Sequence, residues 1–406
     1  MASLLLIIIY LAFISLGLPD SLLGSAWPSM YQELGASVSW AGIITMIIAA
    51  GTIVSSLASD YLTRRLGAGK VTAISVGMTA VALFGFSISN SFWLLCLWAV
   101  PYGLGAGSVD AALNNFVALH YPARHMSWLH CMWGLGASIG PVVMGWAGTG
   151  GLKWNGGYLT ISIMQVALTA VLIFSLPLWR KMQKSHAGKT ENGSETSEKI
   201  PGRHYTLPQL VRLRGVKEVL ICFFCYCALE STAGIWAASY CPLYHGISPE
   251  RAARWASLFY MGITAGRFVC GFITMKVNDR NMIRLGQVVT AVGIVCILLP
   301  VGGTVLFAGL ILVGCGCAPI YPSIIHETPA NFGADLSQSV IGVQMAAAYV
   351  GTCLVPPLFG LIAQYINIGL YPAFMAVILV LMVIMSEKLH IAVGQKNAGF
   401  CTAEEN

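Results

Sequence analysis

The chain has 406 residues, of which 57% are hydrophobic and 9% are charged, and its formal net charge is +6. Soluble domains carry roughly 25% charged residues, because their surfaces must be solvated. The composition therefore excludes a water-soluble enzyme and is typical of a chain that lipid surrounds. The basic residues lie in short connections between apolar stretches, so the positive charge indicates membrane orientation rather than nucleic-acid binding.

Apolar stretches of about 20 residues, each long enough to cross a bilayer as a helix, recur along the chain. In the first part they cover residues 4–33, 39–60, 69–90, 92–119, 126–149 and 155–179. In the last part they cover residues 216–244, 250–275, 282–300, 302–325, 337–365 and 367–386. The sequence thus predicts an all-α membrane protein with twelve transmembrane helices.

A polar stretch rich in Lys, Glu, Ser, Thr and Gly separates the two sets of six helices and is expected to be solvated and partly disordered. The predicted organisation is an N-terminal half at 1–179, a cytoplasmic linker at 180–215, a C-terminal half at 216–390 and a cytoplasmic tail at 391–406.

Placing the linker in the cytoplasm puts 18 of the 22 Lys and Arg residues on the inner side of the membrane. Both termini are then expected to be cytoplasmic, in a protein of the plasma membrane. The sequon that starts at Asn192 would face the cytoplasm and stay unglycosylated.

A glycine and proline pattern repeats between the halves. Gly136, Pro141 and Gly145 recur at the same spacing as Gly351, Pro356 and Gly360, and Gly103-x-Gly105 recurs as Gly314-x-Gly316. Two pseudo-symmetric six-helix halves are a common design of transporters, in which one half rocks against the other around a solute site. The repeat therefore makes transport the leading class of function.

Three carboxylates lie inside the predicted spans, namely Asp20, Asp110 and Glu230. An ionised carboxylate there costs about 3 kcal/mol or more, so each needs a partner or a function. Taking up a proton removes that cost, and we expect these residues to couple transport to protons, with sodium as an alternative cation. The competing interpretation is a structural hydrogen bond to an adjacent helix. Arg267, also within a span, either pairs with a carboxylate or snorkels to the inner face, and we favour the second.

Helical spacing places Gly103, Gly107, Asp110 and Asn114 on one stripe, which we expect to line a cavity. Sugars are bound by amides and carboxylates that hydrogen-bond hydroxyls and by aromatic rings that pack on the apolar face. The expected solute-binding residues are Trp27, Asn114, Asn115, His130, Trp133, Trp236 and Gln344.

The stretch from Ser56 to Gly67 resembles the loop between helices 2 and 3 of the major facilitator superfamily. It carries Asp60, Arg64 and Arg65 at the end of a predicted helix, where charges of both signs can lock one conformation. These three residues are the expected conformational gate, and the alternative is that the charges only orient the chain.

A narrower resemblance is carried by Gly17-Leu-Pro-Asp20 and by the stretch from Gly105 to Phe116, which contains Asp110 and Asn114. Both look like the two acidic stretches of the fucose permease-like sugar:proton symporters, where the acidic residues serve proton coupling and sugar binding. His130 stands where the fucose permease has a glutamine. The resemblance implies the twelve-helix fold of the superfamily and symport of a sugar.

We therefore predict a secondary transporter that carries a sugar or sugar-like solute with protons by alternating access, acts as a monomer, and needs no metal or other cofactor. No phosphate-binding loop is present, so a gradient rather than hydrolysis is expected to drive transport. One rival is a proton-coupled exporter of drugs or metabolites. A second rival is a non-transporting receptor or assembly protein of the same fold.

Overall fold

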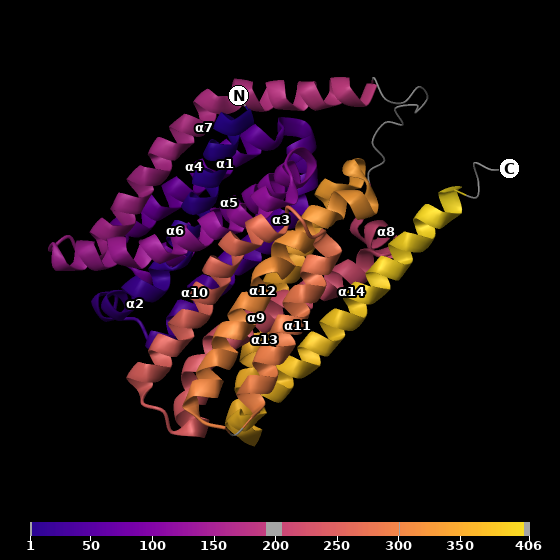
Figure 1. Cartoon of the computed structure of the whole chain (residues 1–406). Coiled ribbons are helices and arrows are strands. Elements are labelled where there is room, and N and C mark those ends of the chain that lie inside the picture. Colours follow the sequence, from indigo (N-terminus) through magenta and orange to yellow (C-terminus); the bar gives the residue numbers. More distant parts are fainter. Residues whose placement is uncertain (1, 192–204, 300, 402–406) are drawn as a thin grey trace. The chain divides into compact units, whose positions relative to one another are not determined.

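The computed structural model describes residues 2–191, 205–299 and 301–401, and the described backbone is mostly helical. Contacts divide the chain into two compact units. The first consists of Met1–His120 with Leu129–Arg203, and the second of Tyr121–Trp128 with His204–Asn406. Figure 1 shows the helices coloured along the sequence from indigo to yellow.

The first apolar run forms two consecutive helices, which are interrupted at Ser21, two residues after Pro19. Proline lacks a backbone N–H group and so weakens the helix at this point. The helices from this part of the chain are α1 (Ala2–Asp20), α2 (Leu22–Glu33), α3 (Ala41–Leu66), α4 (Ala68–Ile88), α5 (Phe92–His120), α6 (Ala123–Thr149) and α7 (Lys153–Glu191).

A short helix, α8 (Leu207–Arg212), precedes the long helices of the second unit. A π-helical turn at Ala363–Asn367 and a 3₁₀ turn at Ile368–Leu370 connect the last two. The long helices are α9 (Val216–His245), α10 (Pro249–Ile273), α11 (Asp279–Leu298), α12 (Gly303–Phe332), α13 (Ala334–Ile362) and α14 (Tyr371–Cys401).

Within the described ranges, each of the twelve predicted apolar runs is helical, which confirms the predicted all-α, two-half class. Nine stretches of the described residues are long and apolar enough to cross a membrane, and one of these covers both α13 and α14. A further apolar helix in the described part of the chain, Ser257–Ile273 of α10, is shorter. Helix α6, which contains His125 and His130, is not among the nine stretches.

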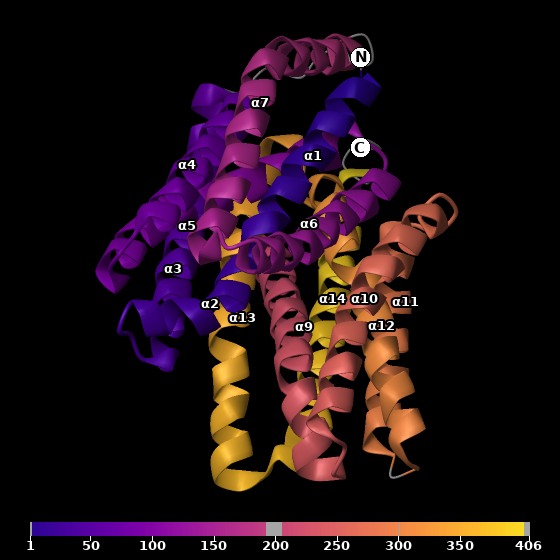
Figure 2. The same ribbon diagram turned by 90° about the vertical axis from the view of Figure 1, so that its left-hand side faces the viewer.

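The predicted repeat is visible in how the first unit packs. Gly103 of α5 lies against the carbonyl of Ile48 in α3, and Gly105 lies against the carbonyl of Ser75 in α4. A Cβ atom at either glycine would meet the backbone of the neighbouring helix, so only glycine permits this approach. Figure 2 shows α3, α4 and α5 side by side.

The second unit repeats these contacts one for one. Gly314 of α12 lies against the carbonyl of Phe259 in α10, and Gly316 lies against Thr290 in α11. The glycine pattern in the sequence therefore records equivalent helix contacts in the two units.

The other half of the repeat behaves in the same way. Gly136 of α6 lies against the carbonyl of Ile14 in α1, and Gly351 of α13 lies against the carbonyl of Phe224 in α9. The fifth helix of each set thus packs closely on the first.

Helix α7 is longer than the apolar run that predicts it, since it continues through the polar residues up to Glu191. The first twelve residues assigned to the linker, 180–191, are therefore helical. The rest of the linker up to residue 204, with the sequon at Asn192, and residues 402–406 of the tail lie outside the described residues.

Candidate functional site

The carboxylate of Asp20 lies at the end of α1, where two helices supply donors to it. The hydroxyl of Tyr102 on α5 donates to Oδ1 at 3.0 Å, and the indole Nε1–H of Trp133 on α6 donates to Oδ2 at 2.9 Å. Asp20 is nevertheless exposed, so other molecules can reach it. Two neutral donors thus hold an accessible carboxylate in a fixed position.

A second carboxylate in the same unit heads a chain of hydrogen bonds. The Nδ2 of Asn114 donates to Oδ1 of Asp110 at 2.7 Å, one helical turn away on α5. Because that amide nitrogen faces Asp110, the amide oxygen of Asn114 accepts from Nε2–H of His130 on α6 at 3.0 Å. Asn114 and His130 are buried, whereas Asp110 is partly exposed. The hydrogen-bonded chain therefore runs from a buried histidine to an accessible acid.

The expectation that the stripe before Asp110 lines a cavity is wrong for its two glycines. Gly103 and Gly107 face the backbone carbonyls of Ile48 and Thr52 in α3. They form a close contact between α5 and α3, which fixes the position of α5 along α3 and therefore the position of Asp110.

In the second unit the acidic residue is paired with a cation. Glu230 of α9 accepts a hydrogen bond from Tyr226 on the same helix, and its Oε2 lies 3.5 Å from Nη2 of Arg267 on α10. Arg267 also donates to the hydroxyl of Tyr226 at 3.4 Å, and its guanidinium carbon lies 6.0 Å from the centre of the Tyr321 ring. The hydroxyl of Tyr226 thus forms hydrogen bonds with both Glu230 and Arg267.

Arg267 does not snorkel, contrary to the favoured prediction. Its side chain is only 3% exposed, and it pairs with Glu230. The alternative interpretation, a carboxylate partner inside the bundle, is correct, because a paired guanidinium can be buried where an unpaired one cannot.

The three predicted solute-binding tryptophans have different surroundings. Trp27 is buried in an apolar cluster with Phe92, and its indole N–H is donated to the carbonyl of Val38 at 2.8 Å. Trp236 donates to the carbonyl of Pro356 at 2.9 Å, with its ring edge-on to a phenylalanine of α13. Only Trp133 is hydrogen-bonded to one of the carboxylates, so the surroundings of the other two favour packing over solute contact.

Two predicted amides are also buried. Asn115 follows Asn114 on α5. Gln344 of α13 accepts a hydrogen bond from the hydroxyl of Thr328 at 3.2 Å, while its Nε2 is buried without a hydrogen-bond partner in the described structure. A buried amide donor without a partner is costly, and its role in solute binding stays a prediction.

The three expected gate residues form local pairs at the end of α3. Nε of Arg64 lies 2.8 Å from Oδ1 of Asp60, and the guanidinium of Arg65 lies over the ring of Tyr61 at 4.3 Å. Asp60 and Arg64 are four residues apart on one helix, which is the standard spacing for such a pair. Their role as a gate stays a prediction.

Tyr102 as the partner of Asp20 and Tyr321 as a neighbour of Arg267 were not predicted. Their proximity depends on helix packing, which no local spacing reveals. A set of charged pairs between α11, α12 and α14 was not predicted either. Glu387 forms a two-point ion pair with Arg284, and Nδ1 of His326 lies 2.7 Å from Oδ2 of Asp279.

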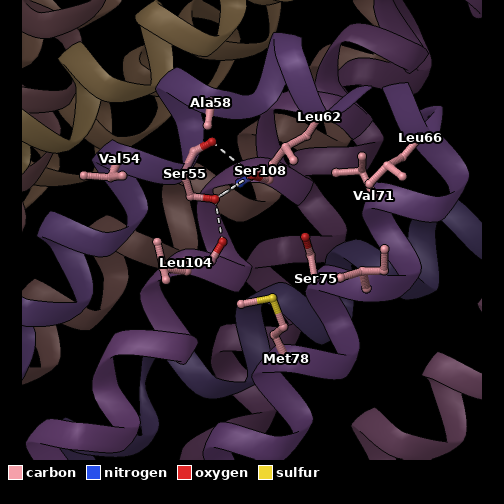
Figure 3. Close-up of a pocket in the computed structure, with 11 residues that line it drawn as sticks. Val54, Ser55, Ala58, Leu62, Leu66, Val71, Ser75, Met78, Leu104 and Ser108 are labelled. Carbon is pink, nitrogen blue, oxygen red and sulfur yellow. Dashed lines mark hydrogen bonds between the residues drawn. The ribbon is translucent and has the colours of Figure 1, made fainter. Parts of the chain in front are cut away.

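A groove of about 230 Å³ lies between α3, α4 and α5 and is mostly apolar (Figure 3). At its polar edge Ser55 is hydrogen-bonded to Ser108 and to the carbonyl of Leu104, at 2.5 Å in each case. Among the described residues, none that lines this groove is a predicted site residue. The hydroxyl pair joins α3 to α5 beside the glycine contact described above.

Comparison with known proteins gives consistent results. The family model described as Major Facilitator Superfamily matches residues 9–248 and 219–392. An uncharacterized transporter of Sinorhizobium fredii, y4wD, is 24% identical over 362 residues, which cover 83% of this chain and 87% of y4wD. The hexuronate transporter of Bacillus subtilis is 23% identical over 328 residues, which cover 78% of this chain and 74% of that protein.

Among solved structures, FucP, the fucose:proton symporter of E. coli, matches with a TM-score of 0.73 at 16% identity. The match covers 95% of this chain and 98% of FucP. At this identity the likeness shows the fold alone. These relatives are transporters and not enzymes, and the family match spans most of the described helices. The chain is a multi-pass membrane transporter of small solutes that belongs to the major facilitator superfamily.

Proposed function

We propose that this transporter is a symporter that carries a sugar or sugar-like solute together with protons by alternating access. The observation that carries the proposal is the hydrogen-bonded chain Asp110–Asn114–His130. A carboxylate held only by neutral donors becomes uncharged when it takes up a proton, and neither Asn114 nor His130 then needs to change its charge. It can therefore load a proton on one side of the membrane and release it on the other.

The second acid of the first unit supports the same function. Asp20 is accessible and is bound by Tyr102 and Trp133, which present a hydroxyl and an aromatic face beside a carboxylate. Carboxylates, amides and aromatic rings are the groups that recognise sugars. We propose Asp20, Asn115, His130 and Trp133 as the solute-contacting residues of this unit.

The orientation in the membrane follows from the charge distribution. We propose that both termini are in the cytoplasm, because the Lys and Arg residues are concentrated in the connections that this orientation places on the inner side. We also propose a monomer in the plasma membrane. The two sequence halves, joined by the linker at 180–215, are proposed to move against each other during transport.

The test is accumulation of labelled solutes by proteoliposomes under an inward proton gradient, with and without sodium. The panel contains aldoses, the matching uronic acids and amphipathic drugs. Accumulation of an aldose or uronic acid without sodium, abolished by a protonophore, is the expected result. Uptake that depends on sodium would show that sodium, and not the proton, is the coupling ion. Proton-driven extrusion of the amphipathic compounds alone would favour the exporter.

A further inference from the structure

Two arginine–glutamate pairs in the second unit differ in geometry. Near the start of α11, Nε and Nη2 of Arg284 bind the two oxygens of Glu387 on α14 at 2.7 and 2.6 Å, which is the two-point arrangement that a guanidinium prefers. Inside the unit, Arg267 approaches Glu230 through one oxygen at 3.5 Å. The buried pair is therefore the looser one, although burial makes good pairing more important.

The charge balance of the buried pair restricts what can happen at Glu230. Arg267 stays protonated at any physiological pH, so the pair is neutral only while Glu230 is ionised. If Glu230 takes up a proton while a neutral solute is bound, a buried guanidinium is left without an anion. If the solute brings a carboxylate, the cluster of Arg267, protonated Glu230 and bound anion is again neutral.

We propose that Arg267 binds the carboxylate of an anionic solute, a sugar acid, and that this carboxylate takes the place of Glu230 when Glu230 is protonated. This inference rests on the proposed symport and specifies its substrate class. The proton goes to Glu230, the ion pair between Glu230 and Arg267 breaks, and an ion pair between the solute and Arg267 forms. Tyr226, which already contacts both residues, keeps the protonated acid hydrogen-bonded.

The other titratable groups near the pair do not provide a competing charge. Tyrosine and cysteine are uncharged near neutral pH. Helix α14, which also packs against α9, presents Tyr371, whose hydroxyl is donated to the carbonyl of Ala233 at 2.8 Å. In the part of the chain that the structure describes, the groups that interact electrostatically with the pair include Tyr226 on α9, Tyr260 and Cys270 on α10, and Cys317 and Tyr321 on α12.

The inference predicts how transport responds to voltage. A neutral sugar carried with one proton moves one positive charge, so a membrane potential drives it. A monoanionic sugar acid carried with one proton moves no net charge. Uptake of the acid should then follow the proton gradient and be unaffected by a potential set with potassium and valinomycin.

The experiment compares uptake of glucose, galactose and mannose with uptake of their uronic acids in proteoliposomes, under a pH gradient or a potential alone. We expect uronate uptake that the pH gradient drives and the potential does not, with the matching aldose inactive. Uptake of an aldose driven by the potential, with uronates inactive, would overturn the anion site and leave the proposed symport standing. Inactivity of both classes in folded protein would overturn the inference and the proposed function together.

Variants identify the residues. Arg267→Lys keeps the charge but loses the two-point fork, and it should weaken uronate transport roughly tenfold or more. Glu230→Gln resembles the protonated acid, so it should retain uronate exchange at equal pH and lose uptake driven by the pH gradient. Arg251→Lys, an exposed arginine on the same helix, is the matched control and should transport normally. A Glu230→Gln protein with normal gradient-driven uptake would contradict the exchange. The voltage comparison uses the unmodified protein, so it holds even if a variant fails to fold.

Discussion

The two units hold their carboxylates in different ways. In the first unit Asp20 and Asp110 are held by neutral donors, namely Tyr102, Trp133 and Asn114. In the second unit Glu230 is held by a tyrosine and a buried arginine. The helix contacts of the two units are equivalent at their paired glycines, so the difference lies in a few polar side chains on a repeated scaffold.

This difference determines what protonation does. A proton on Asp110 removes a charge and leaves no other charge unbalanced. A proton on Glu230 leaves Arg267 unbalanced unless another anion arrives. The first unit is therefore suited to take up a proton with a neutral solute, and the second is suited to take up a proton only together with an anionic solute.

The largest expected effect comes from removing the anion in the second unit. Glu230→Ala leaves Arg267 buried without its carboxylate and should lower the free energy of unfolding by about 3–5 kcal/mol. Asp20→Asn keeps a hydrogen-bonding side chain with no cation left unpaired, so it should cost about 1 kcal/mol. Thermal unfolding of the purified variants in one detergent compares them. Equal losses for the two variants would remove the distinction between the units.

A smaller effect separates the residues of the first unit. His130→Ala removes the donor to the amide of Asn114 and should raise KM about two- to tenfold, the equivalent of one hydrogen bond of about 0.5–1.5 kcal/mol. Trp27→Phe is the control, since the indole of Trp27 bonds to a backbone carbonyl in an apolar cluster. This control should lower stability without changing KM. A raised KM in Trp27→Phe would indicate that Trp27 contacts the solute.

The smallest expected effect is on the stability of α3. The pair of Asp60 with Arg64 is partly exposed and local, so Asp60→Asn should change the free energy of unfolding by about 0.5 kcal/mol or less. The predicted gate adds a kinetic expectation, because a charge lock controls how fast conformations interchange. Turnover in exchange assays should therefore change severalfold in Asp60→Asn, and unchanged turnover would reduce this pair to an orientation signal.

The sequence predicts the helices well because a bilayer requires about 20 apolar residues per crossing, whatever the helices pack against. It predicts the repeat because Gly103 and Gly314 have no substitute where backbones touch. It locates Asp20, Asp110 and Glu230 because acids are rare inside spans.

The partners of these acids could not be predicted in the same way. Tyr102 and Trp133 are 82 and 113 residues from Asp20, and only helix packing brings them together. Arg267 could be placed in a span, but whether it snorkels or pairs depends on the position of α9 beside α10. The continuation of α7 to Glu191 was missed because polar residues ended the apolar run without ending the helix.

The central claim is that one proton moves with each solute. The most direct measurement is the external pH of weakly buffered proteoliposomes when a transported solute is added without sodium. We expect alkalinisation outside with about one proton per solute. Solute uptake with no pH change in the unmodified protein would contradict the claim.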